Sequence, residues 1–149
     1  MSAKLTIPGI LVTKAAQNLP QTATANLFTV SGTVLVTGLL GVVTTAIGAT
    51  ATTLALGTAP GAATTSVATA TAITSKAVGT VATPVGASGI GGALIVGGAA
   101  FVQSPPFALS PFVLGAGCTN ITWTTSANDT GQMEWYLWFT PIDFDASVT

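Results

Sequence analysis

Few side chains of this 149-residue chain could do chemistry, and each lacks the partners that the chemistry would need. Asp143 and Asp145 are one residue apart, so on a strand they would share a face and could bind a cation. No further oxygen ligand lies nearby in the sequence, which favours a solvated edge instead. Cys118 is the only cysteine, and the chain has no histidine that could activate its thiol. We therefore expect Cys118 to be a small, buried apolar residue.

Two further patterns could bind ligands, but each has a simpler structural interpretation. Segment 86–92, GASGIGG, has the glycine content of a phosphate loop. It lacks the Lys-Ser/Thr ending and the helix that should follow, so it predicts a turn-rich connection. The aromatic residues Trp123, Trp135, Tyr136 and Trp138 could stack on a sugar or a base. Aromatic residues that alternate along strands more often lie in a core or a subunit interface. We predict no catalytic residue, no metal site and no cofactor.

The composition directs attention to surfaces rather than pockets. The chain has 27 Thr, 25 Ala and 17 Gly, but only three lysines and four acidic residues. A soluble monomer has about a quarter of its residues charged, against 5% here. A free surface this poor in charge would be sticky, so we expect other subunits or a scaffold to cover it. The near-neutral charge and the absence of a basic patch predict no binding to nucleic acid.

A membrane protein is the competing explanation for the mean hydropathy of +0.73. The best spanning window, Val34 to Ala55, is long enough, but glycines interrupt it and it contains six threonines. Membrane spans are rich in Leu, Ile, Phe and Val and are flanked by basic residues. The N-terminus does not resemble a secretion signal, because Pro8 interrupts its apolar stretch and Lys14 follows. We therefore expect no membrane partner.

The elements that must position these residues are strands, and the stretch from 27 to 57 sets their pattern. The first half of this stretch alternates: Phe28, Val30, Val34 and Val36 fall on one parity, and Thr29, Ser31, Thr33 and Thr37 fall on the other. This alternation predicts a strand with one packed face. We expect strands at Leu27–Thr37 and Leu39–Ile47, with Gly38 and Gly41 at the bend between them.

Further strands follow at spacings of about 8–12 residues with glycine-rich turns, which is typical of an all-β sandwich or barrel. Segment 126–131, SANDTG, predicts a hairpin between strands at Asn120–Thr125 and Gly131–Thr140. Residues 1–25 contain Pro8, Gly9 and Pro20, which block a long helix. We predict a single-domain β-sandwich or barrel over residues 26–149, preceded by an extended N-terminal arm over residues 1–25.

A proline-rich loop, QSPPFALSP at 103–111, gives the candidate contact residues. Phe107 lies in this loop and Phe112 follows it, so both are expected to anchor an interface. The prolines would stiffen the loop and lower the cost of ordering it. In the predicted arm, Lys4 and Lys14 are the only charged residues and are further interface candidates.

Two segments of the chain resemble a group of short structural proteins of tailed bacteriophages. They are residues 27–58, LFTVSGTVLVTGLLGVVTTAIGATATTLALGT, and residues 125–149, TSANDTGQMEWYLWFTPIDFDASVT. The second has the pattern of a small-polar turn, a Trp-containing strand, Thr-Pro and an acidic tail. The Gly- and Pro-rich middle, Gly86–Phe112, departs from the group. The matched patterns concern fold and composition and include no catalytic motif.

The resemblance implies a virion component, a capsid decoration or minor head protein that is made in the host cytoplasm. Its partners would then be the major capsid protein and further copies of itself, with a trimer favoured because trimers fit the three-fold positions of a shell. Two alternatives stay open. One is a tail-tube, fibre or adaptor protein, and the other is a small membrane protein such as a lysis factor.

Overall fold

The computed structural model describes residues 9–59, 66–84, 92–97 and 111–149, and every regular element within these ranges is a β-strand. The strands are β1 (Ile10–Asn18), β2 (Thr24–Ser31), β3 (Val34–Thr45), β4 (Thr53–Ala59), β5 (Ser66–Ala72), β6 (Val81–Pro84), β7 (Gly92–Gly97), β8 (Phe112–Leu114), β9 (Asn120–Thr125), β10 (Gln132–Pro141) and β11 (Ser147–Val148). The predicted all-β class is confirmed. The described ranges contain no helix with the length and hydropathy needed to span a membrane.

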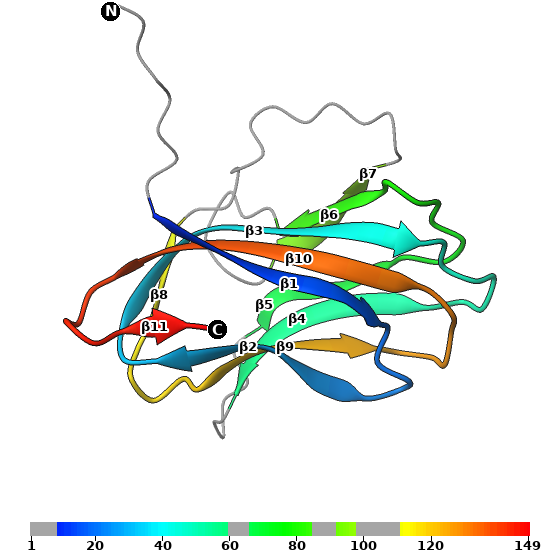
Figure 1. The fold of residues 1–149 in the computed structure, drawn as a ribbon. Coiled ribbons are helices and arrows are strands. Elements are labelled where there is room, and N and C mark those ends of the chain that lie inside the picture. Colours follow the sequence, from blue (N-terminus) through cyan, green and yellow to red (C-terminus); the bar gives the residue numbers. More distant parts are fainter. Residues whose placement is uncertain (1–8, 60–65, 85–91, 98–110) are drawn as a thin grey trace, which may run out of the picture.

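The strands form one sheet that curls into a nearly closed barrel (Figure 1). Its order is β1-β10-β3-β6-β7-β5-β4-β9-β2-β11, and β8 adds to β3 beside this path. All the described pairs are antiparallel except β5 with β7. Strand β7 joins the half that contains β10 and β3 to the half that contains β4 and β9. The open edges of the barrel are β1 and β11.

Two tryptophans meet at the centre of the core. Trp123 comes from β9 and Trp135 from β10, and their rings pack edge to face with centroids 5.9 Å apart and planes at 83°. Both side chains are fully buried, as are Phe28 on β2 and Leu137 on β10. The apolar residues predicted to pack on one parity, Phe28, Val30, Val34 and Val36, are all buried, and Thr29 is exposed. The predicted packed face is confirmed.

The bend predicted at Gly38 is wrong, because the chain turns earlier, at Gly32 and Thr33, between β2 and β3. Gly32 has a φ of +75°, which a residue with a side chain rarely adopts. A Cβ there would also approach the Cβ of Ala146 to 2.9 Å. Gly38 lies inside β3, where the register against β10 shifts between Trp138 and Phe139.

This bulge changes which parity of β3 faces the core. Before it, Val34 and Val36 are buried; after it, the buried apolar side chains are those of Leu39 and Val43. A bulge places two residues opposite one, so the side chains that follow it exchange faces. One long strand with a bulge therefore replaces the two predicted strands.

Residues 10–18, which were expected in the N-terminal arm, form β1 at one edge of the sheet. Ile10 pairs with Phe139 and Asn18 with Gln132, so β1 follows most of β10. The side chain of Val12 packs against the core. The β structure therefore begins well before the predicted boundary at residue 26, and residues 1–8 lie outside the described ranges.

The hairpin predicted at 126–131 is also wrong, although the segment is a connection as expected. Strand β9 pairs with β2 and β4, whereas β10 pairs with β1 and β3. The connection therefore carries the chain from one half of the barrel to the other. Gly131 has a φ of +127°, and a Cβ there would lie 3.0 Å from Ile47. The glycine is thus required for the crossing rather than for a hairpin turn.

The buried face of β3 supplies the first test. We expect Val34→Asp to abolish folding, because Val34 is completely buried and an unpaired charge in an apolar core costs several kcal/mol. Thr29→Asp, on the exposed face of β2, is the matched control and should leave stability within about 0.5 kcal/mol. Soluble yield and denaturant unfolding measure both. Unchanged unfolding of Val34→Asp would refute the assigned face.

Candidate interaction surfaces

The surface of the barrel is almost free of charge along its strands. The eleven strands together carry two charged residues, Lys14 on β1 and Glu134 on β10. The other charged residues of the described ranges lie in connections: Lys76, Asp129, Asp143 and Asp145. Since a typical soluble surface is about a quarter charged or more, these strand faces are unusual for a free monomer.

The outer face of β10 is aromatic. Residues of β10 alternate, so Trp135 and Leu137 point into the core while Tyr136 and Trp138 lie on the opposite face, half-buried. The rings of Tyr136 and Trp138 stack with centroids 6.4 Å apart and planes at 25°. The four predicted aromatic residues thus divide between the two faces: Trp123 and Trp135 are core residues, and the other two lie on the outward face.

Neighbouring strands extend this aromatic face. Leu11 of β1 lies opposite Trp138 in the register, and Leu40 of β3 lies opposite Tyr136. Leu11 is about half exposed. We call the set Leu11, Leu40, Tyr136 and Trp138 the aromatic face. Sequence reasoning missed Leu11 and Leu40, because only the pairing of β1 and β3 with β10 brings them beside the rings.

Glu134 is the only charged side chain on this side of β10, and it is paired. The hydroxyl of Tyr136 donates a hydrogen bond to its carboxylate. This hydrogen bond raises the pKa of Tyr136, so the phenol stays protonated at neutral pH. The carboxylate thereby presents less unpartnered charge to any surface that covers the face.

Lys14, a predicted interface residue, lies on edge strand β1 opposite the buried Trp135. It therefore lies on the core-facing side of the strand and is half-buried. The register shifts between Lys14 and Gln17, which places a bulge next to the lysine. Inward lysines and bulges both hinder a second strand from pairing with an exposed edge. The structure thus gives Lys14 a role in protecting the edge strand β1 from pairing with another strand. Contact of Lys14 with a shell stays a prediction.

Phe112, another predicted anchor, begins β8 and packs half-buried against the core. It lines a recess of about 190 Å³ together with Thr58, Val67, Val113, Leu114, Gly115 and Cys118. Strands β1 and β8 flank the β10–β3 pair, so the structure does not bring Lys14 and Phe112 together. The remaining candidates, Phe107 and Lys4, lie outside the described residues.

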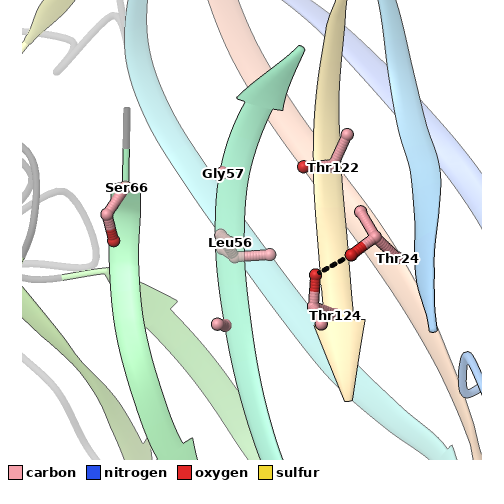
Figure 2. A pocket seen from close by; sticks show the side chains of 7 residues that line it. Thr24, Leu56, Gly57, Ser66, Thr122 and Thr124 are labelled. Atoms are coloured by element: carbon pink, nitrogen blue, oxygen red, sulfur yellow. Dashed lines mark hydrogen bonds between the residues drawn. The ribbon is translucent and has the colours of Figure 1, made fainter. Parts of the chain in front are cut away.

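A hydroxyl-lined hollow of about 250 Å³ lies over β4, between β5 and β9 (Figure 2). Gly57 leaves space at its centre, and Ser66, Thr122 and Thr124 are among the residues around it. The hydroxyls of Thr24 and Thr124 hydrogen-bond each other at 2.7 Å. No charged residue lines the hollow among the described residues, so it offers hydroxyls and apolar surface but no acid or base.

A larger polar hollow, of about 470 Å³, lies beside the 126–131 connection. Asp129 is nearly buried there, and its carboxylate accepts hydrogen bonds from the backbone N–H of Thr130 at 2.7 Å and the Thr52 hydroxyl at 3.3 Å. The amide of Gln21 donates to the Asp129 carbonyl at 2.9 Å. The Gln21 bond fastens the β1–β2 connection to the β9–β10 connection. The carboxylate itself fastens the β3–β4 connection there through Thr52, which is a structural use of the acid.

The pair Asp143 and Asp145, considered as cation ligands, is used differently. One carboxylate oxygen of Asp143 accepts a hydrogen bond from the Thr33 backbone N–H at 2.7 Å. The Thr33 hydroxyl and backbone N–H lower the pKa of Asp143, so it is charged at neutral pH. Within the described ranges, no group of three or more His, Cys, Asp or Glu residues could hold a metal. Asp143 therefore secures the turn after β10.

Cys118 packs against the core as expected, but it is half-buried and not fully buried. Burial raises the pKa of its thiol, and the sulfur donates to the Asn120 carbonyl at 3.5 Å. A raised pKa keeps the sulfur as the less nucleophilic thiol at neutral pH. With no histidine in the chain, the side chain is suited to packing rather than to nucleophilic attack.

No family model matches the chain, and searches of curated proteins and of solved structures found no significant match either.

The Asp143 carboxylate gives a pH-dependent test. Its folded-state pKa lies below the unfolded value of about 3.9, so its stabilising effect is complete above that pH and is lost as pH falls through the folded pKa. We expect Asp143→Asn to melt at a lower temperature than the native chain at pH 6. The two should converge toward pH 2. A melting difference that stays constant from pH 6 to pH 2 would show that the carboxylate charge does not stabilise this turn.

Proposed function

We propose that this chain is a structural protein of a bacteriophage virion, a decoration protein that binds the outside of the head and stabilises it. It acts as a homo-oligomer and catalyses no reaction. The observation that carries the proposal is the distribution of charge, with two charged residues on eleven strands. Such faces are costly to leave in water and suited to burial against other subunits.

The chemistry of the faces fits a protein that covers joints between shell subunits. A cement protein needs contact area that is apolar and able to form hydrogen bonds, and it needs no deep pocket. The aromatic face supplies large side chains of the kind that dominate interface energy. The threonine hydroxyls of the opposite half can bond to partner groups while losing little side-chain entropy. The major capsid protein and further copies of this chain are the proposed partners.

Particle composition tests this proposal. We expect mass spectrometry of intact, detergent-washed particles to find the chain in a fixed ratio to the major capsid protein, with many copies per head. A few copies that separate with the tail would replace the head role with a tail-tube, fibre or adaptor role. Loss of the chain into the detergent fraction would reject a virion role and favour the membrane alternative.

The aromatic face can be tested by introducing a charge. We expect Leu40→Lys to reduce occupancy on particles by about tenfold or more, because a lysine in a dry interface must be desolvated without a partner. Thr69→Lys, at an exposed position of β5, is the matched control and should bind normally. Melting temperatures of both variants exclude unfolding as the cause. Normal occupancy of a folded Leu40→Lys would remove the aromatic face from the contact.

A further inference from the structure

The turn between β10 and β11 carries the most exposed large apolar side chain of the described residues. Phe144 is 102% exposed, and its neighbour Ile142 is 55% exposed. Isolated exposed apolar residues are ordinary, but a whole phenyl ring held in water at the tip of a turn is not. Sequence reasoning missed Phe144 because it considered only the two aspartates on either side of it. The apolar residue between them was the available signal.

The turn that presents Phe144 is fixed by hydrogen bonds on both sides. The backbone N–H groups of Ile142 and Asp143 donate to the Thr33 carbonyl at 2.9 and 3.3 Å. The Thr33 N–H donates back to the Asp143 carboxylate at 2.7 Å, and the Ala146 N–H donates to the Asp143 carbonyl at 3.1 Å. Because the turn is already ordered, binding through Phe144 loses little conformational entropy.

The recess lined by Phe112 lies at the same end of the barrel. Strand β8 pairs with Val34–Val36, and the Phe144 turn binds Thr33, the residue just before them. Figure 1 shows β8 and the β10–β11 turn together at the end where β3 begins. The described residues that line the recess include Val67, Leu114 and Cys118 and no charged side chain. An apolar side chain entering it would meet apolar side chains and no charged group of the described residues.

We propose that Phe144 of one copy of this chain inserts into the Phe112 recess of a second copy. This inference deepens the proposed function by naming the residues of the self-contact, and it rests on that function for its biological setting. Phe144 is fully exposed, so it does not fill the recess of its own copy. The anchor and the recess are different surfaces, which makes the contact heterologous: each copy donates one ring and accepts one.

Charge supports a second copy as the occupant. Phe144 lies between Asp143 and Asp145, so a partner surface carrying carboxylates would repel it. The described lining of the recess has no charged residue, and the Asp143 carboxylate is already hydrogen-bonded within its own turn. A symmetric contact of two Phe144 turns would instead bring four carboxylates together. The uncharged recess is therefore the favoured partner.

The area buried by this contact is small, and this limits how strongly two copies can associate through it. A buried Phe contributes about 150–250 Å², whereas a stable pair needs about 800 Å² from each partner. One contact therefore gives weak association, and stable assembly requires a ring in which every copy makes two contacts, or a shell that holds the copies side by side. A closed trimer would be such a ring.

Sedimentation of the purified full-length chain at increasing concentration tests the contact. We expect the average mass to rise above the 14.6 kDa of one chain. Phe144→Ser should shift association to about tenfold higher concentration or more. Gly115→Trp should do the same by obstructing the recess, because Gly115 lines it and a Cβ there meets nothing within 4 Å, so the larger side chain has room. Gly117→Trp, equally open but outside the recess, and Val78→Ser, exposed at another turn, should associate like the native chain.

Cys118 permits a direct test, because it lines the recess and is the only native cysteine. We expect Phe144→Cys, oxidised with copper–phenanthroline, to form disulfide-linked multimers on a non-reducing gel. Adding Cys118→Ser should abolish them. Equal crosslinking of the double variant would show that two turns meet each other, and this would overturn the proposal. At a concentration where Phe144→Cys still associates in sedimentation, oxidised protein that stays monomeric on the gel would also overturn the proposal.

The results also separate this contact from the proposed function. Self-association through Phe144 in a chain that is absent from particles would overturn the virion role and support the contact. A native chain that stays monomeric at every concentration, or a Phe144→Ser variant that associates like the native chain, would overturn the contact. Particle composition, measured independently, would still decide the virion role.

Discussion

The structure depends on the edge-to-face contact of Trp123 and Trp135 between the two halves of the barrel. Each ring comes from a strand that is central to its own half: β9 lies between β2 and β4, and β10 lies between β1 and β3. Aromatic residues bury large areas, and an edge-to-face pair adds about 0.5–1.5 kcal/mol beyond that burial. The contact also fixes which side chains of β10 point into the core. Because Trp135 must point inward, its neighbours Tyr136 and Trp138 must point outward.

Several features follow from this orientation of the β10 side chains. Outward rings on a central strand need apolar neighbours, and β1 and β3 supply Leu11 and Leu40 in register. The face that results contains one carboxylate, already bonded to the Tyr136 hydroxyl. At the end of β10 the chain must turn back toward β2, and Asp143 fastens that turn to Thr33. The same turn holds Phe144 in water. Core packing and the aromatic face are therefore two sides of one strand.

The sequence was sufficient for the fold class and for the buried face of β2 and of the start of β3, because both follow from a local period of two. It was insufficient wherever strand pairing decides the outcome. The sequence could not show whether Gly38 marks a turn or a bulge, since both place a glycine within a strand pattern. The 126–131 segment has hairpin residues but crosses between halves, which depends on distant Ile47 and Thr52. Leu11 becomes part of the aromatic face only through pairing with β10.

Hydroxyl-radical footprinting of the free chain and of the chain on particles tests the central claim, that the uncharged faces are buried by assembly. The account predicts that Tyr136, Trp138 and Phe144 lose reactivity on particles, while Met133, already buried in the core, reacts little in either state. Exposed Val78, away from the proposed contacts, should react equally in both. Equal reactivity of all three aromatic residues in the free and bound chain would contradict the account.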